Sequence, residues 1–274
     1  LNEIVNNPSK LNLGGQKKEI GILFMDVRGF TTISEKLSPE KVVYLLNTYF
    51  KDATKVIMDN KGFIDKFIGD AIMALWNAPL EDKEFAYHML ISAVEMKHLV
   101  TILSPRYKKE LDVDFNVGIG LNLGDAVVGN LGGEEKINYT AIGDSVNLAS
   151  RLESLTKHYG AHIIISEYLY DKLKTENRLD KFVIRKLDYI KVKGKNKPIY
   201  IYQVIGYSDE KIPEGFFEYE TAFEQYKQKK FDSAQKTLLK YDKDIAAKAL
   251  LERIEKLEKS DLSNWDGSYA FESK

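Results

Sequence analysis

The 274-residue chain carries 40 basic and 41 acidic residues, which gives a net charge of −1 at pH 7. This balance gives no electrostatic reason to expect nucleic acid or an anionic membrane as a partner. The absence of cysteine excludes disulfides and thiolate metal sites, and it fits a reducing, cytoplasmic compartment. The length and a hydrophobic content of 44% predict one main domain with a small appendage.

The first stretch of the chain, residues 1–18, is polar and contains Pro8 and the pair Gly14-Gly15. This composition is typical of a linker that precedes a packed domain. The sequence has no run of 18 apolar residues and no signal-peptide pattern, so we expect no membrane span in it. Because it begins at Leu1 rather than Met, we expect it to be part of a longer protein.

The packed domain opens with an almost wholly apolar run at 20–27, IGILFMDV, whose single acid is Asp26. Such a run predicts a central strand covered on both faces. From Pro39 to about residue 57 apolar residues recur at intervals of three and four, which predicts a helix. In GFIDKFIGDAIMALW, Gly69-Asp70 separates two β-prone runs and predicts a hairpin with Asp70 at its tip.

A helix, a hairpin and another helix are predicted next. Helical spacing covers about 82–103, and the alternating stretch FNVGIGLNLGDAVVGNLG, interrupted at Gly124-Asp125, predicts a second hairpin. Residues 144–158 predict a third helix, which follows Gly143.

Strands at about 162–166, 182–192 and 198–205, with a late hairpin around Gly194, complete a β-α-β-β-α-β-type pattern. This order of elements predicts an α+β sandwich with helices on one face of the sheet.

The texture of the sequence changes beyond Gly206, where residues 216–259 are rich in Glu, Lys, Gln and Ala with helical spacing. The stretch FEYETAFEQYKQKKFDSAQKTLLKY resembles one tetratricopeptide-like helix pair. A single such unit cannot bury its own apolar face, so we expect it to pack on the main domain or on a partner. Trp265 and Tyr269 predict that the polar tail docks as well. The sequence therefore predicts an N-terminal linker at 1–18, a main domain at 19–206, and a helical extension with its tail at 207–274.

Two carboxylates occupy unusual positions in this pattern. Asp26 ends an apolar strand and Asp70 lies at the tip of the hairpin expected beside it, so the two are predicted to share one site. Neighbouring carboxylates repel each other unless a cation lies between them, and Mg²⁺ or Mn²⁺ would satisfy both. The alternative is that Asp70 only serves the turn and Asp26 only pairs with Arg28.

Three stretches, FMDVRGFTTISE, KFIGDAIMALWNAP and YTAIGDSVNLASRLE, resemble the signature stretches of class III nucleotide cyclases. They follow the family's order and spacing within residues 19–206. The resemblance implies a ferredoxin-like catalytic domain that works as a homodimer, with each active site built from both chains. It also implies adenylate cyclase activity, the conversion of ATP to cyclic AMP and pyrophosphate.

Asp26 and Asp70 match the family's two metal-binding aspartates, and the backbone at Val27 is expected to add an oxygen ligand. Two divalent ions, Mg²⁺ or Mn²⁺, would activate the ribose 3′-hydroxyl and neutralise the α-phosphate. Phe30 and Thr31 follow at an expected helix start, whose exposed amides are predicted to hold triphosphate oxygens. An ordinary helix cap is the alternative.

Asn147 and Arg151 lie four residues apart on a predicted helix and so project on one face. The resemblance implies that Asn147 positions the ribose and that Arg151 meets negative charge on the phosphoryl oxygens. Spacing alone would favour an Arg paired with Glu153 or Glu95. Lys193, in KVKGKNKP, matches a lysine that contacts the terminal phosphates; a solvated turn is the alternative.

Lys66 and Thr140 match the family's two base-recognition positions. The best-known mammalian pattern is a lysine and an aspartate, and Thr140 replaces that aspartate, as in relatives that respond to bicarbonate. A threonine hydroxyl can accept a hydrogen bond from the adenine amino group or, by rotating, donate one to the guanine carbonyl. Adenine is favoured, guanine stays open, and bicarbonate regulation is implied by resemblance only.

Three other functions compete with this interpretation. A guanylate cyclase is disfavoured by Lys66, and an inactive dimeric nucleotide-binding regulatory domain is disfavoured because the matched catalytic positions are filled. A metal-dependent phosphohydrolase would need a water-activating group besides the two aspartates. The lead-in and the WDG-containing tail resemble bacterial cyclases with a membrane-anchored sensor, so we expect this part to lie at the cytosolic face without membrane contact of its own.

Overall fold

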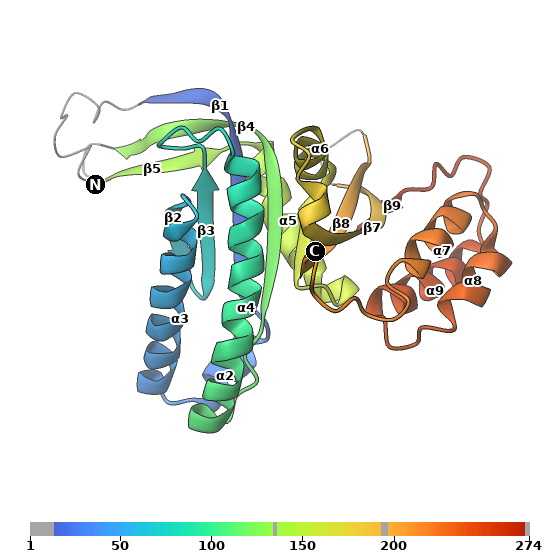
Figure 1. Ribbon diagram of the computed structural model, residues 1–274, viewed down its shortest axis with the longest axis horizontal. Helices are drawn as coiled ribbons and strands as arrows, with labels where there is room; N and C mark the ends of the chain where they lie inside the picture. Colours follow the sequence, from blue (N-terminus) through green and yellow to red (C-terminus); the bar gives the residue numbers. More distant parts are fainter. Residues whose placement is uncertain (1–13, 134–135, 193–196, 272–274) are drawn as a thin grey trace.

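The computed structural model describes residues 14–133, 136–192 and 197–271, and a continuous sheet runs through them (Figure 1). The strands lie in the order β2-β3-β1-β4-β6-β8-β7-β9, and β5 pairs with β4 off this path. The strands are β1 Gly14–Val27, β2 Phe63–Ile68, β3 Ala71–Trp76, β4 Val117–Gly133, β5 Lys136–Ile142, β6 Ile163–Ser166, β7 Phe182–Lys191, β8 Ile199–Tyr207 and β9 Tyr269–Ala270.

Elements β1, α3, β2, β3, α4 and β4 follow one another in the chain, while β4, β1, β3 and β2 are neighbours in the sheet in that order. This is the ferredoxin-like arrangement, so the predicted α+β fold is confirmed. No helix among the described residues combines the length and apolar character needed to cross a membrane. The helices are α2 Phe30–Lys36, α3 Pro39–Asp59, α4 Phe85–Leu111, α5 Asp144–Tyr159, α6 Glu167–Thr175, α7 Glu218–Lys227, α8 Phe231–Leu238 and α9 Ile245–Leu257.

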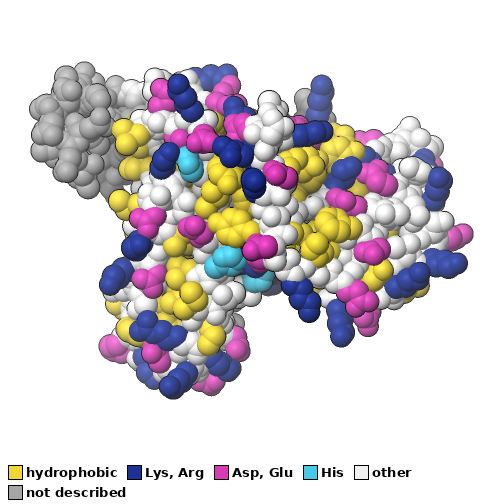
Figure 2. Space-filling model, viewed as in Figure 1, with side chains coloured by type: hydrophobic (Ala, Val, Ile, Leu, Met, Phe, Trp, Pro, Cys, Tyr) yellow, Lys and Arg dark blue, Asp and Glu magenta, His cyan; other side chains and the backbone are white. Residues whose placement is uncertain are grey.

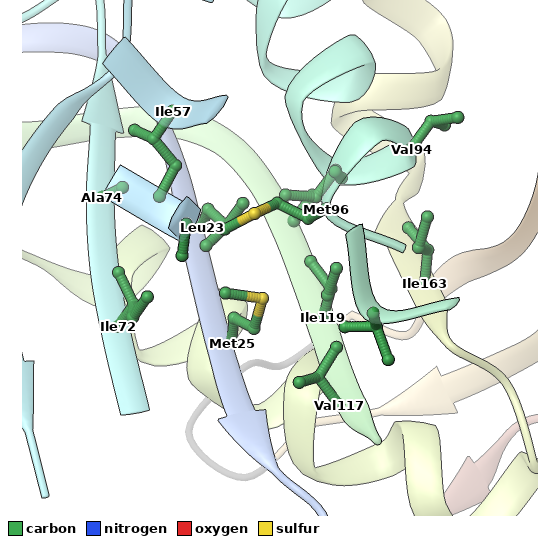
Figure 3. Close-up of a cluster of buried hydrophobic side chains, with 14 of the residues drawn as sticks. Leu23, Met25, Ile57, Ile72, Ala74, Val94, Met96, Val117, Ile119 and Ile163 are labelled. Atoms are coloured by element: carbon green, nitrogen blue, oxygen red, sulfur yellow. The ribbon is translucent and has the colours of Figure 1, made fainter. Parts of the chain in front are cut away.

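Helices α3 and α4 lie on one face of the sheet (Figure 1). Strand residues alternate between faces, so Leu23 and Met25 of β1 point to the same side. There they pack in one buried cluster with Ile57 of α3, Met96 of α4 and Ile119 of β4 (Figure 3). This core holds the carboxyl end of β1 in place.

Helix α5 covers the opposite face, so the prediction of helices on one face only is wrong. Ile20 and Ile22 of β1 pack there with Ala149 of α5. The helix comes unusually close to β4, because Gly120 has no side chain: a Cβ at Gly120 would lie 2.1 Å from the backbone nitrogen of Glu153. The close contact at Gly120 therefore sets the distance between α5 and the sheet.

Two strands differ from expectation. β1 begins at Gly14, inside the stretch 1–18 assigned to the linker, because Gly14 pairs closely with β4; a Cβ at Gly129 would lie 2.1 Å from the Gly14 carbonyl oxygen. β4 runs unbroken through Gly124, so the predicted hairpin there is wrong. That glycine makes room for Ser145, whose Oγ would lie 2.6 Å from a Cβ at position 124.

The C-terminal helices α7, α8 and α9 form a group at one end of the sheet (Figure 1). The predicted helix pair is confirmed as α7 and α8. Phe223 of α7 and Leu250 of α9 share a buried cluster with Leu187 of β7 and Leu152 of α5. The group therefore covers its apolar face against the main domain, as predicted for a unit that cannot cover itself.

Buried ion pairs fasten this group. Arg253 of α9 donates two hydrogen bonds to the Asp188 carboxylate of β7, at 3.0 and 2.7 Å, and the Tyr159 hydroxyl of α5 donates to the same carboxylate. Arg185 of β7 donates to Asp244, which precedes α9, at 2.5 and 3.1 Å. The helical group is thus joined to both the sheet and α5.

The tail docks on the same region, as predicted. Tyr269 lies in β9, which pairs in parallel with β7 at Ile190. The ring of Trp265 packs 5.0 Å from that of Tyr226, between ring centroids.

We expect Arg253→Met to lower the free energy of unfolding by about 3–5 kcal/mol, because it leaves the carboxylate of Asp188 buried without its cation. Urea unfolding followed by circular dichroism measures this. Lys55→Met is the matched control: it breaks an exposed pair with Asp59 and should leave the free energy of unfolding almost unchanged. Equal losses in the two variants would contradict the stabilising role of the buried pair.

Candidate functional site

Asp26 and Asp70 come together because of strand register. β1 and β3 pair antiparallel, with Met25 opposite Ile72, so the end of β1 lies beside the turn between β2 and β3. Gly69 occupies that turn with a φ of 63°, a conformation that favours glycine. The backbone N–H of Val27 donates to Asp70 Oδ2 at 3.3 Å. The two aspartates therefore lie in one site, as predicted.

The two carboxyls interact unfavourably when both are charged. Burial, followed by a hydrogen bond with Asp70 and the charge of Asp70, raises the pKa of Asp26 to about 7. Burial and the charge of Asp26 likewise raise the pKa of Glu153 on α5 to about 7. Arg28 does not pair with Asp26: it donates to the carbonyls of Val117, at 3.2 Å, and Ala161.

The donor set fits a hard divalent cation. Among the described residues no group of three or more His, Cys, Asp or Glu side chains is arranged to hold a metal, so the candidate ligands are the two aspartates. Mg²⁺ is usually held by one or two carboxylates together with water and substrate phosphates, rather than by an all-protein cage. A cation between Asp26 and Asp70 would also offset the charge repulsion that adds to burial in raising the pKa of Asp26.

The segment after Asp26 turns at once into helix α2. Gly29, with a φ of 66°, precedes the helix, and Phe30 and Thr31 form its first turn. This turn contains no acidic residue, and Thr31 is exposed. The expected helix start is therefore confirmed, while the binding of phosphate oxygens to it stays a prediction.

Asn147 and Arg151 lie on α5, where Asn147 is exposed and Arg151 is half-buried. The start of this helix is tied to β4 because Asn122 Nδ2 donates to the Ser145 carbonyl at 2.9 Å and Ser145 Oγ donates to the Asp125 carbonyl at 3.0 Å. The candidate catalytic pair therefore stands on a helix whose position is set by direct contacts with the sheet. The catalytic roles of the pair stay predictions.

Lys66 and Thr140, the two residues predicted to recognise the base, also lie together, and that role stays a prediction. Lys66 Nζ of β2 donates to Thr140 Oγ1 of β5 at 3.1 Å. A third member, Asp65, was not predicted. Its Oδ2 accepts the Thr140 hydroxyl at 2.6 Å, and its side chain is only 1% exposed. The only signal in the sequence was an acid directly before a site lysine.

One predicted site residue cannot be placed. Lys193 and the predicted hairpin around Gly194 lie outside the described residues. The structure thus brings site residues together in two groups, Asp26 with Asp70 in the ferredoxin-like core and Lys66 of that core with Thr140 of the adjoining strand β5.

The surface charge is mixed. Figure 2 shows Lys and Arg side chains dispersed among Asp and Glu over the visible face, without one large basic field. This agrees with the net charge of −1 and gives no support to a nucleic-acid interface on that face.

Comparison with known proteins identifies the family. Residues 14–206 match the profile of the adenylate and guanylate cyclase catalytic domain. The chain belongs to this family, as its three signature stretches indicated.

Among its relatives, the chain is 40% identical over 189 residues to the terminal-differentiation specific adenylate cyclase of Dictyostelium discoideum. It is 36% identical over 190 residues to adenylate cyclase 1 of Rhizobium meliloti (strain 1021). Each alignment covers 69% of this chain, but only 9% of the first protein and 28% of the second. The match is therefore confined to a part of each relative.

Two crystal structures resemble the fold closely. The guanylyl cyclase Cya2 is similar at a TM-score of 0.64 with 35% identity, and the alignment covers 72% of this chain and 96% of that one. The adenylyl cyclase CyaB from P. aeruginosa is similar at 0.64 with 33% identity, covering 73% and 98%. One of these structures is a guanylyl cyclase and the other is an adenylyl cyclase, so the comparison does not by itself decide between GTP and ATP.

We expect Mn²⁺ to raise the melting temperature more at pH 8 than at pH 6, because Asp26, with a pKa of about 7, must lose its proton before it can bind a cation. Thermal unfolding at both pH values, with and without Mn²⁺, measures this. Asp70→Asn should lose the gain, whereas Asp114→Asn, at an exposed acid that pairs with Lys108, should keep it. A gain that is the same in Asp70→Asn would argue against this metal site.

Proposed function

We propose that this chain is an adenylate cyclase, which converts ATP to 3′,5′-cyclic AMP and pyrophosphate. The observation that carries the proposal is the juxtaposition of Asp26 with Asp70 and of Lys66 with Thr140 in a domain of the cyclase family. The two relatives named above at 36% and 40% identity are adenylate cyclases, which supports ATP as the substrate.

In the proposed reaction the ribose 3′-oxygen attacks the α-phosphorus, its bond to phosphorus forms, and the bond to the bridging oxygen of pyrophosphate breaks. Asp26 and Asp70, with a backbone oxygen at Val27, would hold two ions, Mg²⁺ or Mn²⁺. Bound metal supplies a lower pKa for the 3′-hydroxyl and positive charge for the departing phosphates. The chain's own contribution is to hold the Asp26 carboxylate near the end of β1 and the Asp70 carboxylate in the turn beside it.

Other residues are assigned to the substrate. Lys66 donates to the base and the Thr140 hydroxyl accepts from its amino group. Asn147 positions the ribose, and Arg151 meets the negative charge that develops on the phosphoryl oxygens. Amides at Phe30 and Thr31, together with Lys193, hold the remaining phosphate oxygens; these further assignments rest on the family resemblance.

We further propose that the active form is a homodimer in which each site combines the two aspartates of one chain with the base-recognition residues and Arg151 of its partner. Apolar side chains are exposed near both groups, which supports a partner there: Phe67 and Ile68 end β2, and Val127 lies opposite Ile142 across β4 and β5. Exposed apolar side chains that lie next to each other, as in each of these two pairs, are typical of an interaction surface.

The location and regulation follow from the same proposal. The use of ATP and the absence of cysteine fit a cytoplasmic location. The presence of Thr140 in place of an aspartate suggests stimulation by bicarbonate, and a flat activity curve across added bicarbonate at fixed pH would contradict that.

The test of the activity is HPLC product analysis with ATP, and separately GTP, in the presence of Mn²⁺. We expect cyclic AMP, and a loss of roughly 100-fold or more in Asp70→Ala, because the transition state loses its charge stabilisation. Asp114→Ala is the control and should keep full activity. Cyclic GMP as the main product would identify a guanylate cyclase, and no cyclic product from a confirmed dimer would indicate an inactive regulatory domain.

A further inference from the structure

We propose that Asp65 is a positioning residue that selects adenine over guanine, because it determines the direction in which the Thr140 hydroxyl points. This inference rests on the proposed function, since it concerns how the same site chooses its base. Asp65 contacts no substrate in this account and acts only through Thr140.

A local irregularity of β2 puts Asp65 in place. Ile64 pairs with Ala74 and Lys66 pairs with the next residue, Met73, so Asp65 is the extra residue of a β-bulge. In a regular strand Asp65 and Lys66 would point to opposite faces. The bulge re-aims the side chain, so both residues reach the same hydroxyl on β5.

The hydroxyl has one proton, and its two neighbours decide where that proton goes. Lys66 Nζ, 3.1 Å from Thr140 Oγ1, can only donate. The Asp65 carboxylate, 2.6 Å away, can only accept. The proton of Thr140 therefore points to Asp65, and the hydroxyl keeps only acceptor capacity for a third partner. The rotation that would let it donate is no longer open.

This direction favours adenine. The 6-amino group of adenine donates to an acceptor, whereas the 6-carbonyl of guanine would face the Thr140 oxygen with no proton between them. A buried acceptor that faces another acceptor loses its hydrogen bond, and such mismatches discriminate strongly between substrates. In this account Asp65 gives the threonine the acceptor character of the aspartate found at this position in the mammalian pattern.

The deciding variant is Asp65→Asn. Asp65 Oδ1 faces Lys66 Nζ at 3.3 Å and Oδ2 faces Thr140, so the amide should turn its oxygen to the lysine and its NH₂ to Thr140. The Thr140 hydroxyl can then rotate and donate its hydrogen bond to the base. We expect the ratio of kcat/KM for ATP to that for GTP to fall roughly 10-fold or more, with kcat/KM for GTP rising.

Three further variants complete the experiment. Asp65→Ala also removes the acceptor, and it should lower the ratio in the same direction if Asp65→Asn does not fold. In a Thr140→Val background the change at Asp65 should leave the ratio unchanged, because the hydroxyl through which it acts is gone. Asp82→Asn, at a largely buried acid that pairs with His88, is the matched control and should keep the wild-type ratio.

Equal losses of kcat/KM for ATP and GTP in both Asp65 variants would overturn the proposal, since a purely structural role weakens both substrates alike. A change that persists in the Thr140→Val background would overturn it too. If the wild-type chain forms no cyclic nucleotide, the proposed function fails. In that case the affinities for fluorescent ATP and GTP analogues, measured in the same variants, still decide whether Asp65 selects the base.

Discussion

The arrangement of this site depends on two carboxylates that the fold forces together. Asp26 is the last residue but one of β1, whose residues from Ile20 onward are mostly buried, and Asp70 occupies a turn that the β1–β3 register places beside it. The paired backbones of β1 and β3 keep the two residues close together. Burial, a hydrogen bond with Asp70 and the charge of Asp70 together raise the pKa of Asp26 to about 7, and a divalent cation is the simplest group that would offset the charge of the two carboxylates.

The sheet also positions the second set of candidate catalytic residues. Because Gly120 has no side chain, α5 packs directly on the backbone of β4. This contact sets the distance from the sheet to the helix that bears Asn147 and Arg151. The far end of α5 is held by the C-terminal helices, through Tyr159 and its shared contact with Asp188. The helical group is therefore joined to the helix that carries the candidate transition-state residues, rather than to a distant surface.

Local pattern was enough to predict most of the helices, though not α6, together with the βαββαβ order and the neighbourhood of Asp26 and Asp70, because periodicity and a turn signal are properties of short segments. It failed where a residue serves a contact distant in sequence. Gly124 has the appearance of a turn residue but makes room for Ser145, and Asp65 acquires its role only from a bulge whose register depends on β3. No feature of the sequence near Asp65 indicates that its neighbour across the site is Thr140.

The central claim is that one chain carries two complementary half-sites, and mixing two inactive variants tests it most directly. One chain carries Asp70→Ala, and the other carries Lys66→Ala with Arg151→Ala. In a mixed dimer one site holds all the lesions and the other is intact, so we predict that cyclase activity returns on mixing. A mixture no more active than its separate components, with mixed dimers confirmed, would contradict the shared site.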